Sequence, residues 1–248
     1  QVSVISVWDT VGDDHVDSGF AKALEYLKTY DPADPLIQTT LGGKSSDDPL
    51  VLVTELINMA DLIIQMIDIF YKEELINTKI VKVENSILNP SLQQKKNFEG
   101  LVDNYVADGL NICIDLLMNQ VEEILDTYLK DLDYNVAVDS PSIADGPTEA
   151  CSKVIELLEQ NIDLLVGCTD KSVVEVYQKE IVERLFQVIV KTLKKRTISV
   201  TGAMSLINDL NTYYEFVLEH IKTNRRAITP LFQALKKVGN IYLISGSD

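Results

Sequence analysis

The stretch KKNFEGLVDNYVADGLNICIDLLMNQVEEIL (residues 95–125) contains no proline, and its apolar residues recur every three or four positions. This spacing places them along one face of an α-helix, which must pack against other helices to leave water. Asn89 and Pro90 precede it in the order typical of a helix start, a capping side chain and then proline. Gly100 and Gly109 indicate either a break in the helix or the close approach of a neighbour. If the helix continued to residue 130, it would be about 60 Å long.

A second apolar helix is predicted directly after Asp48 and Pro49, which repeat the same start signal. The run VLVTELINMADLIIQMIDIF has the length of a membrane-spanning helix. It also contains Glu55, Asp61 and Asp68, and each of these side chains would be costly to place in lipid. We therefore expect a core helix of a folded domain.

The remainder of the chain predicts further helices and no sheet, since no segment shows sustained alternation of polar and apolar residues. The fold class expected is all-α, with the helices packed antiparallel in bundles. Its expected parts are an irregular N-terminal segment with a short helix (1–47), a first bundle of long helices (48–146) and a second, basic bundle (147–248). The later helices are expected from Pro147 to Gly167, from a capping-box pattern at Ser172 and Glu175 to the basic run KTLKKR, from Thr201 to about Lys222, and from Thr229-Pro230 onward.

The charge is strongly negative and unevenly distributed. The formal net charge of −16 argues against nucleic acid as a partner, because a nucleic-acid binder must neutralise phosphates. Residues 1–170 carry ten Lys and Arg against 31 Asp and Glu, whereas residues 171–248 carry 12 against seven. Three scattered cysteines form no disulfide or metal-binding pattern, which suits a cytoplasmic protein. The chain does not begin with methionine, so we expect it to be an excerpt.

The basic residues of the C-terminal part are the candidate binding site. If antiparallel packing gathered them at one end of the molecule, they would attract anionic lipid headgroups or an acidic protein. Cations at helix C-termini also complement the helix dipole, which is the structural alternative. The residues concerned are Lys191, Lys194, Lys195, Arg196, Arg225 and Arg226.

Support for catalysis is weak, and we expect no enzyme activity, cofactor or metal. The segment DDHVD (residues 13–17) matches the Asp-Asp-X-X-Asp spacing by which isoprenoid synthases hold magnesium. The segment NDLNTYYE (residues 208–215) nearly matches the second metal motif of that class, with its glutamate one residue early. The first motif is flanked by Gly12 and Gly19, so an acidic loop explains it more simply. A magnesium-dependent isoprenoid-synthase-like enzyme is thus a minor alternative, and a helical-repeat scaffold adaptor is another.

A family resemblance becomes visible at TEACSKVIELLEQNIDLLVGCTD and KKRTISVTGAMSLINDLNTYYEFV. These segments resemble exocyst complex component five and its fungal relatives, the recyclins. The match includes Cys151 after Pro-Thr-X-Ala, Gly202-Ala203-Met204, Asp209-Leu210-Asn211 and Tyr213. The segment at Asp133-Tyr134 and the closing ITPLFQALKKVGNIYLI extend the resemblance, which covers about residues 50–244.

The resemblance implies an elongated rod of antiparallel helical bundles, as in other tethering-complex subunits. It also implies a non-enzymatic subunit of such a complex, which brings vesicles to a target membrane through protein–protein contacts. Exocyst-type exocytosis and recyclin-type endosomal recycling both fit, and the sequence does not separate them. The partners it implies are other tethering-complex subunits and small GTPases of the Rab and Rho type, and an anionic membrane surface is a further candidate. The location it implies is cytoplasmic, with peripheral association to vesicles, endosomes or the plasma membrane. No catalytic residues carry over.

Overall fold

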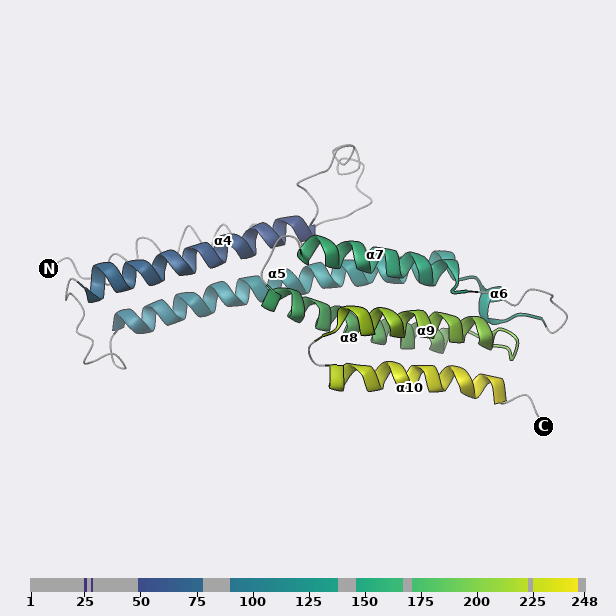
Figure 1. The fold of residues 1–248 in the computed structure, drawn as a ribbon. Helices are drawn as coiled ribbons and strands as arrows, with labels where there is room; N and C mark the ends of the chain where they lie inside the picture. Colours follow the sequence, from purple (N-terminus) through teal and green to yellow (C-terminus); the bar gives the residue numbers. More distant parts are fainter. Residues whose placement is uncertain are drawn as a thin grey trace. The chain divides into compact units, whose positions relative to one another are not determined.

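The computed structural model describes residues 49–77, 90–137, 146–166, 171–222 and 225–244, together with Glu25 and Lys28. Within these residues all regular structure is helical and no strand occurs, so the predicted all-α class is confirmed (Figure 1). The elements are α4 (Pro49–Phe70), the π-helix η1 (Tyr71–Ile76), α5 (Pro90–Tyr128), α6 (Asp131–Tyr134), α7 (Glu149–Val166), α8 (Lys171–Lys195), α9 (Ala203–His220) and α10 (Arg225–Ile244).

The chain divides into two compact units, Gln1–Cys113 and Ile114–Asp248, and the division falls inside α5. The helix α5 is continuous over its 39 residues, so the glycines in it cause no break. A Cβ added at Gly100 would meet nothing within 4 Å, and a close helix contact is therefore not its role. The predicted bundle boundary between residues 146 and 147 lies within the second unit and stays a prediction.

In the first unit, α4 packs antiparallel on the N-terminal part of α5. Ala60 of α4 and Val102 of α5 form a buried cluster, against which Ile64 and Phe98 also pack. Lys95 forms an ion pair of 2.5 Å with Asp68. Residue numbers rise along α4 as they fall along α5, which is the mark of an antiparallel pair.

The helix α4 buries only one of its faces among the residues described. Leu50, Val53, Ile57 and Ala60 are at most 3% exposed, as expected for a core helix. The opposite face exposes large apolar side chains, namely Met59, Leu62, Met66 and Ile69. By length and composition the helix from Leu50 to Ile76 could cross a membrane, and only 28% of its most apolar window is buried. The expectation of a core helix therefore holds for one face and not for the other.

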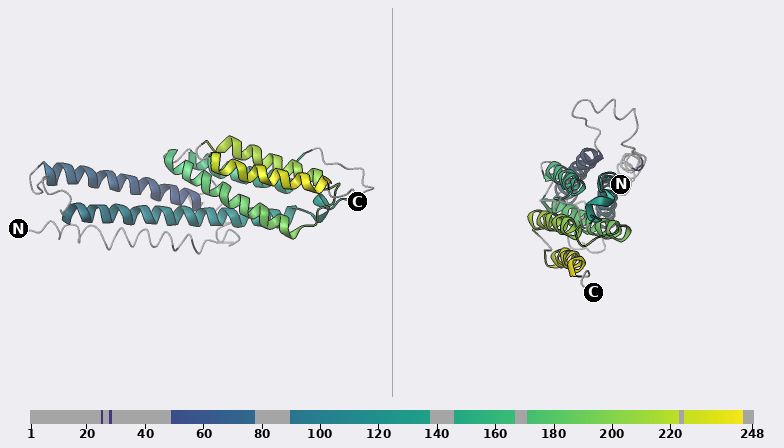
Figure 2. Two further views of the ribbon diagram at one scale, coloured as in Figure 1. Left: turned by 90° about the horizontal axis from the view of Figure 1, so that it is seen from below. Right: turned by 90° about the vertical axis from the view of Figure 1, so that its right-hand side faces the viewer.

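The second unit contains the rest of α5 and the helices α6 to α10. Consecutive long helices run in alternating directions, so α5 and α8 run in the same direction (Figures 1 and 2). Each helix contributes apolar side chains to the core, including Ile114, Leu117 and Val121 of α5, Val154, Leu158 and Ile162 of α7, Ile181 and Leu185 of α8, Leu206 and Leu210 of α9, and Ile228 and Phe232 of α10.

Several predicted helix starts differ from those observed. The helices α7 and α9 begin two residues after Pro147 and Thr201, and the final helix differs most. The final helix begins at Arg225, and Pro230 lies inside it. Burial of Ile228 stabilises the turn before the proline, which outweighs the lost backbone hydrogen bond. Ser172 lies within the first turn of α8, where Lys171 pairs with Glu175 at 3.5 Å. The capping residues Asp48 and Asn89 lie outside the described residues.

Candidate functional site

The carboxylate of Asp209 is the centre of a buried polar network in the second unit. Asp209 is 1% exposed and lies on the inner face of α9, between the apolar residues Leu206 and Tyr213. Tyr134, the last residue of α6, donates its hydroxyl proton to Asp209 Oδ2 at 2.6 Å. Thr148 donates twice, from its backbone N–H to Oδ1 at 2.6 Å and from its hydroxyl to Oδ2 at 2.7 Å. One carboxylate thus joins α6, α9 and the residue before α7.

Burial and hydrogen bonding act on Asp209 in opposite directions. Loss of water raises the pKa of this carboxyl, while the hydrogen bonds from Tyr134 and Thr148 lower it. The pKa lies above its ordinary value, so desolvation is the larger effect. Burial first, and then the nearby charge of Asp209, also raise the pKa of the Tyr134 hydroxyl. Tyr134 therefore keeps its proton and acts as a hydrogen-bond donor.

Cys151 lies beside this network and is not poised to react. Its side chain is fully buried, and its Sγ donates to the backbone oxygen of Asp209 at 3.8 Å. Burial, and then the charge of Asp209, raise the pKa of the thiol well above its usual range. Cys113 is also a buried thiol. Both side chains fill space in the core, and Cys168 lies outside the described residues.

The turn before α9 packs directly on the backbone of Tyr134. The N–H of Ser199 donates to the Tyr134 carbonyl oxygen at 2.9 Å, and the Ser199 hydroxyl donates to the carbonyl of Val136 at 2.9 Å. The N–H of Gly202 donates in turn to the Ser199 hydroxyl at 3.0 Å. A Cβ at Gly202 would fall 1.8 Å from the Tyr134 carbonyl oxygen. Glycine is required here by close backbone approach.

This geometry holds helices together and leaves the carboxylate no open side for a substrate. Both oxygens of Asp209 accept hydrogen bonds from protein donors. The second of the two magnesium motifs considered above therefore has its aspartate in the core. The first, with Asp13, Asp14 and Asp17, lies outside the described residues. Within the part of the chain that is described, no group of three His, Cys, Asp or Glu side chains is placed to hold a metal ion.

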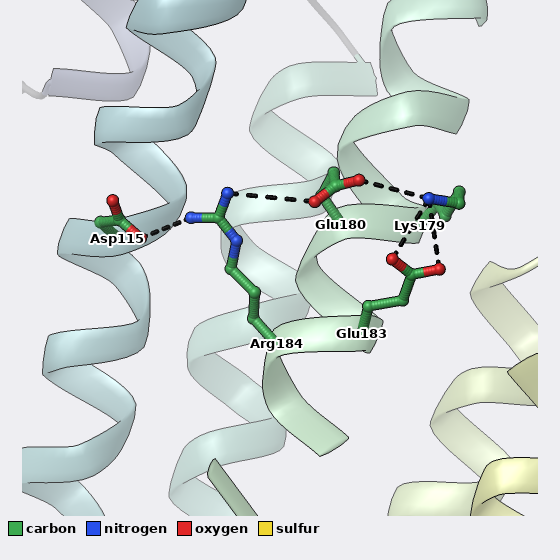
Figure 3. A network of polar contacts seen from close by, with 5 residues as sticks. All are labelled: Asp115, Lys179, Glu180, Glu183 and Arg184. Atoms are coloured by element: carbon green, nitrogen blue, oxygen red, sulfur yellow. Dashed lines mark hydrogen bonds and ion pairs between the residues drawn. The ribbon is translucent and has the colours of Figure 1, made fainter. Parts of the chain in front are cut away.

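Ion pairs connect α8 to α5 along one side of the second unit. Arg184 contacts Asp115 at 2.5 Å and Glu180 at 3.9 Å (Figure 3). Lys179 continues the network to Glu180 and Glu183, each at 3.2 Å. Further along, Lys191 pairs with Glu122 at 2.7 Å, and Arg196 pairs with Asp131 at 2.6 Å. Two of these pairs, Arg184 with Asp115 and Lys191 with Glu122, join α8 to α5 directly.

The predicted basic site is divided by the fold. Lys191 and Arg196 are held by these ion pairs, and Lys194 and Lys195 are exposed at the C-terminal end of α8. Arg225 donates from Nε to the carbonyl of Ile221 at 2.9 Å and also to the carbonyl of Leu218, which caps α9. Since α8 and α10 run in the same direction, the end of α8 and the start of α10 lie at opposite ends of the unit (Figure 1). The six residues do not gather into one patch.

Residues 4–248 match the family described as exocyst complex component Sec10-like, alpha-helical bundle. The chain belongs to this family. The match extends over almost the whole chain, including the N-terminal residues that the resemblance in the sequence did not reach. The resemblance to exocyst complex component five and the recyclins is thereby confirmed.

Among curated proteins, this Sec10-like bundle is 42% identical to Recyclin-1 of Saccharomyces cerevisiae over 94% of the chain and 29% of that protein. It is 30% identical to F-box protein pof6 of Schizosaccharomyces pombe over 96% of the chain and 26% of that protein. Exocyst complex component 5 of Oryza sativa is 26% identical over 58% of the chain and 18% of that protein. The bundle spans less than a third of the length of these relatives.

The residues that carry the resemblance converge in the structure of this Sec10-like bundle. Tyr134, Cys151, Gly202, Asp209 and Tyr213 all lie in or beside the Asp209 network. Sequence reasoning did not connect them, because the partners of Asp209 are 61 and 75 residues away along the chain. One signal was available: Asp209 shares a helical face with Leu206, Leu210 and Tyr213, and a carboxylate at a core position requires partners.

Proposed function

We propose that this chain is the Sec10-like bundle of a recyclin-type subunit, which acts without catalysis in vesicle traffic by protein–protein contacts. The observation that carries this proposal is the 42% identity to Recyclin-1 over 94% of the chain. Similarity to exocyst subunits is lower and covers about half of the chain, which favours the recyclin branch. F-box protein pof6 likewise matches over 96% of the chain, which is more than the exocyst subunits cover.

The partners we propose are other subunits of a tethering assembly, with Rab- or Rho-type GTPases as regulators. The peripheral location on vesicles, endosomes or the plasma membrane is part of the same proposal. The closed Asp209 network supports a structural role for the polar core, because its carboxylate is already satisfied. The unequal lengths of the helices, from 18 to 39 residues among the long ones, support a bundle over an evenly repeating adaptor.

A segment exchange tests the proposal. Recyclin-1 in Saccharomyces cerevisiae would carry this chain in place of its own matching segment, and the return of an endocytosed fluorescent membrane protein to the cell surface would be followed. We expect recycling to be restored relative to a strain lacking Recyclin-1. The control chimera carries Glu215→Gln, a change at an exposed position of α9 that leaves the core intact. A chimera that is folded and expressed at normal level yet restores no recycling would contradict the proposal.

Contact with an anionic membrane is proposed for the exposed lysines at the end of α8. Double substitution of Lys194 and Lys195 by glutamate should reduce sedimentation with phosphatidylserine vesicles at low salt. The double change Lys222→Glu and Arg226→Glu, at exposed positions of the opposite end of the unit, is the matched control for net charge. Equal binding of both variants and the unsubstituted chain would exclude a lipid site at these lysines. Arg225 is unsuitable for this comparison because it caps α9.

A further inference from the structure

The helix α10 presents two apolar stripes, and the bundle uses only one of them. The inner stripe contains Ile228, Phe232, Leu235 and Gly239, which are all buried. Phe232 contacts Phe186 of α8 edge to face, with ring centroids 5.8 Å apart. A Cβ at Gly239 would lie 3.1 Å from Ile207 of α9, so the two helices pack closely at this point. The inner stripe attaches α10 to α8 and α9, and Gln233 and Lys236 add contacts to Tyr214 of α9.

The outer stripe is exposed and consists of Ala227, Leu231, Ala234, Val238 and Ile241. Each of its first four members lies one residue before a member of the inner stripe. Its residues are separated by four, three, four and three positions, which is the heptad spacing of a seam between two helices. Leu231 and Val238 are each 39% exposed and Ile241 is 60% exposed, while the two alanines are also exposed. In the end-on view of Figure 2, α10 lies at the edge of the bundle.

The composition of the outer stripe indicates what would cover it. Alanines are interspersed with larger aliphatic residues, and the resulting uneven surface can interdigitate with the side chains of another helix. A lipid surface would favour a wide apolar face with aromatic side chains, and the stripe is narrow and has none. The helix α10 contains four basic residues and no acidic residue. Arg226 and Lys237 are exposed on the solvent side of the stripe.

We propose that the outer stripe of α10 binds an acidic amphipathic helix of a partner protein. The apolar face of that helix lies on Leu231, Val238 and Ile241, and its acidic flank faces Arg226 and Lys237. Pairing of two copies through α10 is disfavoured, because each α10 brings four positive charges and like charges repel. This inference deepens the proposed function and rests on it, since it names the kind of partner that a tethering subunit would contact here.

Site-specific photocrosslinking tests the proposal in the whole protein. Benzoylphenylalanine replaces Val238 on the stripe or, as the control, Asn240, which is exposed two residues away. The protein is irradiated in its native cells, and crosslinked peptides are identified by mass spectrometry. We expect the Val238 position to crosslink to a peptide of another protein that has heptad-spaced apolar residues and a net negative charge, and the Asn240 position to do so several-fold less.

Two variants decide whether the stripe and its charges cause the contact. Leu231→Asp should abolish the crosslink from position 238, and the double change R226E and K237E should lower its yield at least about threefold. Circular dichroism confirms folding, since all three positions are exposed. Crosslinks to lipid, to a second copy of the chain or to a peptide without that pattern would overturn the proposal, as would equal yields at both positions or none at all. If recycling by the chimera is intact in any of these cases, the proposed function stands and the helix site alone fails.

Discussion

Asp209 is held by three donors from residues far away in sequence, so its removal leaves several buried polar groups without partners. Asp209→Ala should lower the free energy of unfolding by at least about 3 kcal/mol, because each orphaned buried donor costs about 1–3 kcal/mol. Asp209→Asn should cost less, since the hydroxyls of Tyr134 and Thr148 can rotate to accept from the amide. Urea unfolding at pH 7 measures both, with Glu215→Gln on the same helix as the exposed control. Similar losses for all three variants would contradict the role of the network.

The raised pKa of Asp209 predicts a distinctive dependence of stability on pH. Burial makes the folded protein hold the carboxyl proton more tightly than the unfolded chain does. The resulting stabilisation is complete below the ordinary pKa of the carboxyl and is lost as the pH rises through the folded-state value. The difference in unfolding free energy between the unsubstituted chain and Asp209→Asn should therefore be larger near pH 4 than near pH 7.5. A difference that grows with pH would show that the hydrogen bonds outweigh desolvation.

Two glycines should respond to alanine in opposite directions. Gly202→Ala places a methyl group against the Tyr134 carbonyl oxygen, so the backbone must shift, at a cost of about 1–3 kcal/mol. Gly100→Ala adds a methyl group in open space within α5 and should stabilise the protein by about 0.5–1 kcal/mol. Thermal unfolding of the two variants measures this contrast. Stabilisation by Gly202→Ala would show that the turn before α9 does not pack as described.

At the scale of the single helix, α4 shows how burial can differ between two faces of one apolar element. Ile57 is 1% exposed and Met59, two residues later, is 52% exposed. Ile57→Ala should cost about 2–5 kcal/mol of unfolding free energy through lost burial and the cavity created. Met59→Ala should change it by less than about 0.5 kcal/mol. Chemical unfolding of the two variants tests the assignment, and equal losses would indicate that both faces of α4 are covered in solution.

Sequence periodicity predicted the helices well in their middles and less well at their starts. In α7 and α9 the residues of the apolar repeat are the ones that are buried, because the repeat places them on the face that packs against other helices. The start of α10 was missed because Pro230 is normally a boundary signal, and only the packing of Ile228 shows that the helix begins earlier. The division of the basic residues was also invisible, since it depends on helix directions and on ion pairs such as Lys191 with Glu122.

The outer stripe of α10 was partly visible in the sequence and was not recognised. In the sequence, Leu231 and Val238 follow the same helical spacing as Phe232 and Leu235, which are buried. Two heptad stripes offset by one residue look like one broad stripe until neighbouring helices show which part is covered. The structure separates them, because the inner stripe is buried against α8 and α9 whereas Leu231 and Val238 of the outer stripe are each 39% exposed.

At the scale of the whole molecule, the opposite charges of the two parts of the chain have a structural use. The acidic part includes α5 and the basic part includes α8, and their side chains meet in the pairs Asp115 with Arg184 and Glu122 with Lys191. Asp115 and Glu122 are seven residues apart on α5, and their partners are seven residues apart in the same order on α8. This is expected for two helices that run in the same direction. Exposed ion pairs add little stability, about 0–1 kcal/mol each, so their larger effect is on the choice of neighbour and register.

The helix α5 contributes buried side chains to both units and should make their stabilities interdependent. Val102 belongs to the core of the first unit, and Ile114, Leu117 and Val121 belong to that of the second. Asp108 is an exposed residue of α5 between these two groups. Asp108→Pro removes a helix hydrogen bond and clashes with the preceding turn, at a cost of about 3 kcal/mol or more. Hydrogen exchange should then become faster in peptides of α4 and of α8 alike. Asp108→Ala, which keeps the helix, should leave both unchanged, and faster exchange in peptides of one unit alone would show that the two units unfold independently of α5.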